Sequence, residues 1–373
     1  MYTGFENFEN QGIENVRLLE QITQLLELDN DYVTEIQIEG RSIIATTQKG
    51  NIFQIKGIRM FIENVDNQLL LNFNIPEGNL HTGEGFNQYY FDINLWDIVL
   101  NQPNTLEGGY RIDDARIEFQ STKLVSNCTE LQKANIGCKV PIKLFTDEKM
   151  FTDDDKVQYG LLILKIPEQI RRVSEVNYKH ETLWYILGRT LRTLHDNKIF
   201  GAISHTGNIS IEEDYLKFDI SEIKEKYNNN EFPKILLHDL YLTNIVYNLN
   251  QNNNIISHKA HDIINVLLIL SHILRLLLEY QINSNDAQIA IKYYSNNSIK
   301  TYFYTFIQGY FHDQQIDEEY LNNLLEIVIN LVQVINVKIM KAISESKTNE
   351  DRPNEKFPEL KSLLTCLEPL LRS

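Results

Sequence analysis

Apolar residues follow two different spacings near the start of the chain. Between residues 13 and 28 they recur every three or four positions, which is typical of an amphipathic helix. Apolar and polar residues then alternate from 32 to 62, with turn signals at Gly40 and at Lys49-Gly50. This pattern predicts a helix followed by a three-stranded antiparallel meander.

The segment from 64 to 110 is irregular, with Asn, Gly and Pro scattered among aromatic residues, and we interpret it as an insertion. Within it the patterns favour strands at 68–75 and a helix at 91–101. Beyond the insertion we expect a helix at 112–135 and two strands, at 138–145 and 159–166.

The pattern changes to a helical one after Pro167. Residues 181–197 have helical spacing and lead into a loop and an expected β-hairpin that begins near Asn208 and ends at Asp219. The apolar segments 263–278 and 324–343 contain polar and charged residues, so we predict core helices there and no membrane span.

These elements predict an α+β protein with the bilobal outline of a protein-kinase-like fold. We expect an N-terminal helix in residues 1–29, an antiparallel-sheet lobe in 30–165 that carries the insertion at about 64–110, and a helical lobe in 166–373.

Charge and cysteine content exclude several classes of function. The 373 residues have a formal net charge of −16, which argues against binding to a nucleic-acid backbone or an anionic membrane surface. The three cysteines form no metal-binding spacing and suit a reducing compartment. The first residues have neither a basic start nor an apolar core, so we expect no signal peptide and a cytoplasmic location.

Lys56 and Glu118 are candidates for one half of a nucleotide site. Lys56 alternates with apolar residues on the third expected strand, where a lysine can hold phosphates as a point charge. In kinase-like folds a Glu of the next helix pairs with this lysine, and Glu118 lies in the middle of that expected helix. The alternative is that both side chains are simply exposed to solvent.

Asn208 and Asp219 are candidates for a metal site. They lie at the two ends of the expected hairpin, and an amide oxygen and a carboxylate together suit Mg²⁺ bound to phosphates. The alternative is that Asn208 is a turn residue and Asp219 the N-cap of the following helix. Asp239 competes with Asp219 for the metal but lies further from the loop in sequence.

Two further residues could contribute charge or proton transfer. His205 is the one residue of the loop that titrates near neutrality, although a solvent-facing histidine is the alternative. Arg171 could donate two hydrogen bonds to a phosphate, and surface exposure is its alternative.

Taken in order, these residues resemble the selenoprotein O family of kinase-like proteins that transfer AMP. Gln54-Ile55-Lys56-Gly57 is similar to the family's Q-L-K-G, and the segment 201–211 with Asp219 follows the order of its H-G-V-x-N-T-D-N-M-S-I and D-Y-G motifs. The segment 167–171 looks like the family's P-S-H-I-R, and 258–278 is similar to its N-Q-P helix in hydrophobic pattern. Gly207 stands where the family has its acidic base, and Gly201 where it has the leading His.

The resemblance implies a divergent pseudokinase that binds ATP and Mg²⁺ or Mn²⁺ between its lobes, and AMP transfer to protein hydroxyls if it is active. Lys56 and Arg171 would then contact phosphates, Glu118 would hold Lys56, and Asn208 and Asp219 would bind the metal. The alternative function is a catalytically inactive interaction protein in a larger assembly, with the insertion and the acidic surface as its contact regions.

Overall fold

The computed structural model describes the chain in several segments. They cover residues 16–39, 42–57, 88–92, 97–101, 110–146, 158–167, 172–173, 180–203, 208–240, 244–245, 255, 258–260, 262–263, 266, 297–327, 355–356, 365–369 and 371. The chain forms two compact units, each described here by itself. The first comprises residues 1–86, 102–127 and 138–169, and the second comprises 87–101, 128–137 and 170–373.

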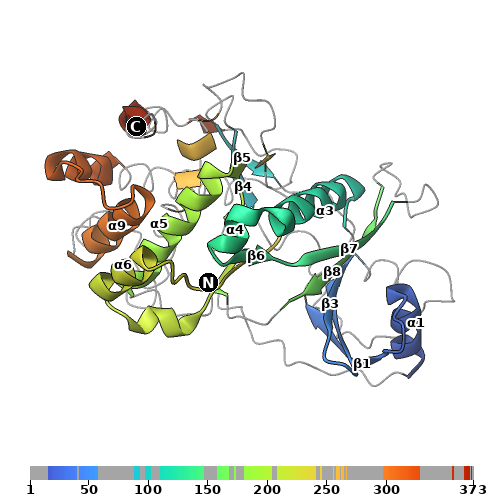
Figure 1. Cartoon of the computed structure of the whole chain (residues 1–373). Helices are drawn as coiled ribbons and strands as arrows, with labels where there is room; N and C mark the ends of the chain where they lie inside the picture. Colours follow the sequence, from blue (N-terminus) through green and yellow to red (C-terminus); the bar gives the residue numbers. More distant parts are fainter. Residues whose placement is uncertain are drawn as a thin grey trace, which may run out of the picture. The chain divides into compact units, whose positions relative to one another are not determined.

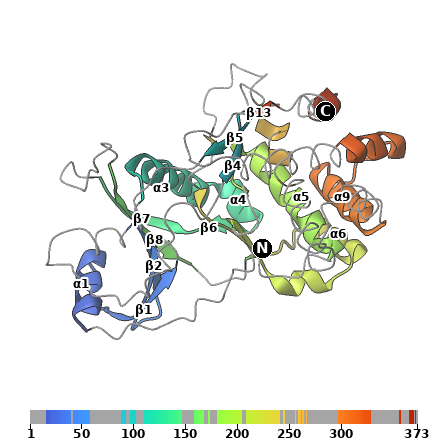
Figure 2. The same cartoon turned by 180° about the vertical axis from the view of Figure 1, so that it is seen from behind.

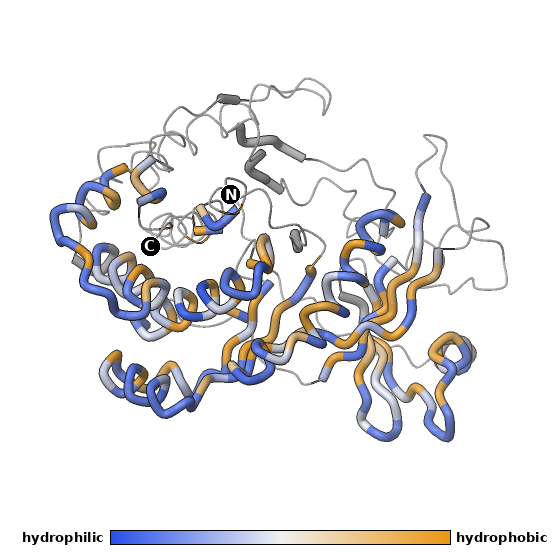
Figure 3. Tube along the Cα trace, turned by 45° about the horizontal axis from the view of Figure 1, so that its top comes forward, coloured by the Kyte–Doolittle hydropathy of each residue, from blue (hydrophilic) through white to orange (hydrophobic). Residues whose placement is uncertain are grey.

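A five-stranded antiparallel sheet with the strand order β1-β2-β3-β8-β7 forms the framework of the first unit (Figure 1). The expected α+β class and the antiparallel meander are therefore confirmed. Most strand centres are hydrophobic and the turns hydrophilic, as Figure 3 shows. The strands are β1 (Val33–Glu39), β2 (Ser42–Thr47), β3 (Ile52–Lys56), β7 (Val140–Phe145) and β8 (Leu161–Ile166).

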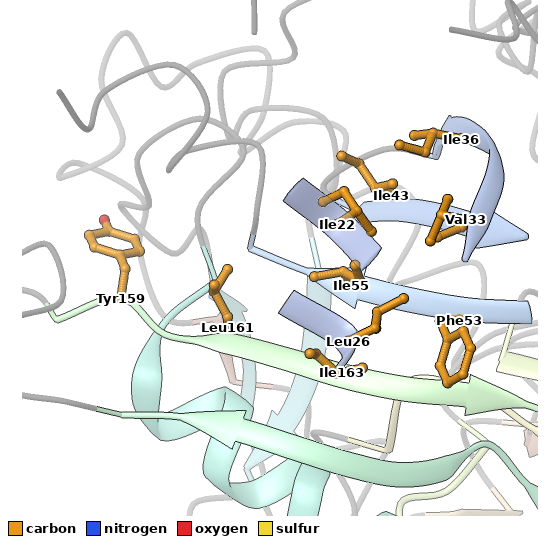
Figure 4. Close-up of a cluster of buried hydrophobic side chains, with 11 residues drawn as sticks. Ile22, Leu26, Val33, Ile36, Ile43, Phe53, Ile55, Tyr159, Leu161 and Ile163 are labelled. Atoms are coloured by element: carbon orange, nitrogen blue, oxygen red, sulfur yellow. The ribbon is translucent and has the colours of Figure 1, made fainter. Parts of the chain in front are cut away.

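One face of this sheet packs against helix α1 (Val16–Leu26). Figure 4 shows Ile22 and Leu26 of the helix beside Ile55 and Ile163 of the sheet, and all four are buried. Alternation along each strand directs every second side chain to this face. The same alternation sends the residues between them to the other face.

The other face packs against helix α3 (Ile112–Asn127). Leu162 and Leu164 of β8 are buried there with Ala115 of the helix. This helix ends at Asn127, and a separate short helix α4 (Thr129–Lys133) follows it. The single helix expected at 112–135 is therefore wrong, because the extended backbone of Cys128 interrupts it.

Asp31 anchors the turn between β2 and β3. Its carboxylate accepts hydrogen bonds from the Thr47 hydroxyl (2.7 Å), the Asn51 amide (3.0 Å) and the backbone N–H groups of Lys49 (3.1 Å) and Tyr32 (3.0 Å). Desolvation acts to raise the pKa of Asp31, but these hydrogen bonds outweigh it, and the pKa lies below its ordinary value.

We expect Asp31→Asn to destabilise the protein at neutral pH but not in strong acid. A lowered pKa contributes stability above the ordinary value of about 3.9, and this contribution is lost as the pH falls through the folded-state value. Urea unfolding across pH 2–7 should therefore show the two proteins converging at low pH. Asp29→Asn, at an exposed position, is the control. A difference that stays constant with pH would contradict the prediction.

Helix α5 (Glu181–Asp196) packs along α9 (Asn297–Tyr310) in the second unit, and the two lie side by side in Figures 1 and 2. Gly188 and Gly309 meet at their crossing. A Cβ on Gly188 would lie 2.2 Å from the carbonyl oxygen of Phe306, and one on Gly309 would lie 2.3 Å from that of Tyr185. Both positions therefore require glycine.

The segment that was expected to form the hairpin contributes one strand to a small sheet, and a second small sheet includes the strand just before it in the chain. Strand β10 (Ile209–Ile211) pairs with β11 (Ile235–Leu237), not with residues 216–218, in a sheet of order β10-β11-β6. Residues Glu213–Lys217 form the 3-10 helix η4, so the expected hairpin is wrong. The remaining elements here are β6 (Ile136–Cys138), α6 (Ile220–Asn228), and the antiparallel pair β9 (Ile199–Phe200) and β12 (Asn244–Ile245).

The helix expected at 91–101 is also wrong. An antiparallel strand pair, β4 (Gln88–Asp92) and β5 (Asp97–Asn101), occupies this part of the chain, and β13 (Glu355–Lys356) adds to its edge. The strands expected at 68–75 lie outside the described residues, as does most of the apolar segment 263–278. None of the helices in the described segments is long and apolar enough to cross a membrane.

Candidate functional site

Lys56 and Glu118 form a buried ion pair in the first unit. Lys56 ends β3 on the face that packs against α3, and Glu118 lies in the middle of that helix. The Lys56 Nζ lies 2.7 Å from Oε1 and 2.8 Å from Oε2 of Glu118, and the two side chains are only 10% and 1% exposed. The predicted pairing is confirmed, and the alternative of two solvated side chains is excluded.

Tyr110 and Gly57 complete the surroundings of this pair. The Tyr110 hydroxyl donates a hydrogen bond to Glu118 Oε2, and the centre of its ring lies 5.5 Å from Lys56 Nζ. Gly57 has φ of +83°, and a Cβ there would lie 2.5 Å from the carbonyl oxygen of Gly160. Only glycine fits after Lys56, which explains the last position of the Gln-Ile-Lys-Gly motif.

A second buried polar network lies on the same face of the sheet. Gln54 precedes Lys56 by two residues, so both side chains point to one face. The Gln54 amide donates to the Ser42 hydroxyl over 2.8 Å, and its carbonyl oxygen accepts a hydrogen bond from Lys139. All three side chains are buried. No motif or spacing in the sequence pointed to Ser42 or Lys139.

Asn208 and Asp239 lie at the same end of the β10–β11 ladder in the second unit. Ile209 pairs with Leu237, and the backbone N–H of His238 donates to the carbonyl oxygen of Asn208 over 2.8 Å. Asp239 is the next residue, and its φ of 51° is unusual for a residue other than glycine. Such backbone conformations are enriched at functional sites. The Asn208 side chain is 1% exposed.

Asp219 has a structural role at the start of helix α6. Its carboxylate accepts hydrogen bonds from the backbone N–H of Glu222 (2.9 Å) and the hydroxyl of Ser221, and Glu222 completes a capping box. These hydrogen bonds, that of Ser221 foremost, lower the pKa of the exposed Asp219. This is the N-cap that the sequence left open as an alternative. A metal-binding role for Asp219 was expected because a hairpin would bring it beside Asn208. The hairpin does not form, so this reason no longer holds.

The loop after β9 is held by a buried hydrogen-bond network. The backbone N–H of Gly201 donates to Asp262 Oδ2 (2.8 Å), and His195 Nε2 lies 3.0 Å from the same oxygen. His195 Nδ1 lies 2.7 Å from the Tyr310 hydroxyl. Desolvation lowers the pKa of His195, although Asp262 opposes this, so we assign a neutral ring that donates to Asp262 and accepts from Tyr310. No sequence signal pointed to this network.

His238, which no sequence pattern pointed to, precedes Asp239. His238 Nε2 is 2.7 Å from the hydroxyl of Ser210, and both side chains are buried. By contrast, His205, Gly207 and Arg171 lie outside the described residues, so their predicted roles remain predictions. Within the described part of the chain, no group of three or more His, Cys, Asp or Glu side chains could hold a metal ion.

The geometry thus consists of a buried Lys–Glu pair in one unit and an Asn and an Asp at one ladder end in the other. A lysine held in place by a glutamate suits the binding of phosphates, and amide and carboxylate oxygens suit a hard divalent cation. Comparison of the chain with protein-family models and with curated proteins found no match.

Proposed function

We propose that this protein is a divergent pseudokinase that binds ATP together with Mg²⁺ or Mn²⁺. The buried Lys56–Glu118 pair is the observation that carries this proposal. In protein kinases a lysine of the third strand binds the nucleotide phosphates and pairs with a glutamate of the following helix. A buried ion pair costs desolvation energy and is weak evidence for stability alone, which favours a functional reason for it.

The strand pairing of the second unit supports the same proposal and favours Asn208 and Asp239 as the metal ligands. In protein kinases the metal ions are held by an Asn of the catalytic loop and by the Asp of the DFG motif. Here Asn208 precedes β10, and Asp239 follows its partner β11. An amide oxygen and a carboxylate, completed by phosphates, fit Mg²⁺. We therefore propose Asp239, in place of Asp219, as the acidic ligand.

Neither of the two positions at which related motifs have an acidic base is acidic in this sequence. The kinase motif H-R-D-x-x-x-x-N has its Asp five residues before the Asn, and that position is Ile203, which is buried. The selenoprotein O-like base position is Gly207. Loss of a general base costs a factor of about 10²–10⁴ in rate. We propose that transfer of AMP to protein hydroxyls is very weak or absent.

A thermal-shift experiment tests the proposed nucleotide site. We expect millimolar ATP with Mg²⁺ or Mn²⁺ to raise the melting temperature, because a ligand that binds only the folded state adds about 2.7 kcal/mol at a hundredfold excess over Kd. Lys56→Met removes the proposed phosphate contact and Asp239→Ala removes the proposed metal ligand, so each should abolish the shift. Asp219→Ala, which removes only a helix cap, is the matched control and should keep it.

Each contrary outcome has a separate meaning. If the nucleotide-dependent rise in melting temperature is lost in Asp219→Ala and kept in Asp239→Ala, Asp219 and not Asp239 is the acidic metal ligand. If no nucleotide shifts the wild-type protein, the alternative function, a catalytically inactive interaction protein of a larger assembly, is favoured.

Transfer activity is tested with labelled ATP. We expect Gly207→Asp to increase self-labelling from α-labelled ATP above the very low wild-type level, because it restores an acid at the base position of the selenoprotein O-like motif. His205→Ala should change little if the loop only positions the ion. Strong wild-type transfer of the γ-phosphate, with no AMP adduct by mass spectrometry, would contradict both the pseudokinase proposal and the resemblance.

A further inference from the structure

We propose that Tyr110 is the positioning residue of the Lys56–Glu118 pair, so that its phenol controls how Lys56 presents its charge to a phosphate. This inference rests on the proposed function for its nucleotide part. Its structural part concerns only the ion pair, and can be tested without any nucleotide.

Glu118 is held from two sides. Lys56 Nζ lies at nearly equal distances from both carboxylate oxygens, 2.7 and 2.8 Å, and the Tyr110 hydroxyl donates to Oε2. Two donors in different directions fix the plane of a carboxylate that otherwise turns about three side-chain torsions. The ammonium group of Lys56 is hydrogen-bonded to both carboxylate oxygens of Glu118. Fixing the Glu118 side chain therefore also fixes the position of this ammonium group.

Tyr110 is also held by the sheet, through its backbone. Its carbonyl oxygen accepts a hydrogen bond of 2.9 Å from the backbone N–H of Gly160, just before β8. The side chain is 2% exposed and packs in a cluster with Leu162 and Leu164. The phenol therefore ties the glutamate of the helix to the sheet that carries Lys56.

Tyr110→Phe separates this role from packing. The variant keeps the ring, its contact with Lys56 and its buried area, and removes only a hydrogen bond to a charged group. We expect the Kd for ATP in the presence of Mg²⁺, measured by calorimetry, to rise about tenfold, the effect typical of a lost hydrogen bond to a charged group.

The nucleotide-independent measurement is the labelling rate of Lys56 by an amine-reactive N-hydroxysuccinimide ester, followed by peptide mass spectrometry. We expect Lys56 to be labelled several-fold faster in Tyr110→Phe than in the wild type. Lys139 is the internal reference, because it is buried on the same face of the sheet but bonds to Gln54. Faster labelling of both lysines would mean that the unit opens as a whole, and would overturn the inference.

Tyr185→Phe is the matched control. It also removes a phenol-to-carboxylate hydrogen bond, that of Tyr185 to Asp313 (2.9 Å), but from the second unit. We expect it to leave both the labelling of Lys56 and the Kd for ATP unchanged.

The outcomes separate the inference from the function on which it rests. No ATP binding by the wild type, together with faster labelling of Lys56 in Tyr110→Phe, would reject the proposed function and keep the positioning role. Unchanged labelling of Lys56 in the variant would overturn the positioning role, whether or not ATP binds. ATP binding that Tyr110→Phe does not weaken would overturn its part in the nucleotide site.

Discussion

Replacing Glu118 with alanine is expected to lower the free energy of unfolding of the first unit by about 3–5 kcal/mol, because it leaves the ammonium of Lys56 buried without this carboxylate. The Tyr110 hydroxyl also loses its acceptor. Because the chain has two units, a single unfolding transition cannot be assumed. Hydrogen exchange of peptides from β3 and β8, measured in urea, reports the first unit separately.

The double variant Lys56→Met/Glu118→Leu is the control for this prediction. It removes both charges and replaces them with apolar side chains, so it should lower the free energy of unfolding less than Glu118→Ala alone. Its main remaining cost is the lost hydrogen bond from the Tyr110 hydroxyl to Glu118. If the free energy of unfolding falls equally in Glu118→Ala and in the double variant, side-chain volume and not the buried charge determines the loss of stability.

Replacing Gly188 with alanine is expected to destabilise the second unit by about 3 kcal/mol or more, at the upper end of the cost of overpacking. The new Cβ would lie 2.2 Å from the Phe306 carbonyl oxygen and 2.7 Å from the Tyr310 backbone nitrogen. Both are backbone atoms of α9, so no side chain can move aside, and the two helices must separate. Urea unfolding followed by hydrogen exchange of α5 and α9 peptides measures the loss.

Gly137→Ala is the matched control for the helix crossing. A Cβ at Gly137 would lie 3.9 Å from the nearest atom, the Ile235 carbonyl oxygen, which is an ordinary contact. We expect the free energy of unfolding of this variant to lie within about 1 kcal/mol of the wild-type value. A loss as large as that of Gly188→Ala would show that any added methyl group is harmful here, and would contradict the close-approach argument.

Local periodicity was sufficient to predict several elements, and a kinase-like pattern added one contact. Helix α1, the strands β1 to β3 and helix α5 lie where the spacing of apolar residues predicted a helix, the meander and a further helix. The Lys56–Glu118 contact was predicted from strand alternation, which set the face of the lysine, together with the kinase-like pattern in which a glutamate of the following helix pairs with it.

Pairing between distant segments was not predictable in this way. Residues 209–218 have the alternation of a hairpin, but β10 pairs with β11, and an intervening 3-10 helix and α6 separate the two strands in the chain. Local patterning indicates that a strand has a buried face but not which strand pairs with it. For this reason the hairpin was wrong, and Asp239 was ranked below Asp219.

The sequence by itself determined the α+β class, the antiparallel meander and the presence of helical segments before and after it, because periodicity is a local property. Only the tertiary structure decided that Asp239 shares a ladder end with Asn208, that Tyr110 contacts Glu118, and that Asp262 holds the loop at Gly201. These contacts join segments that are distant in the chain or depend on the direction of a buried side chain. They are fixed by the packing of the whole unit, which cannot be derived from a local sequence pattern.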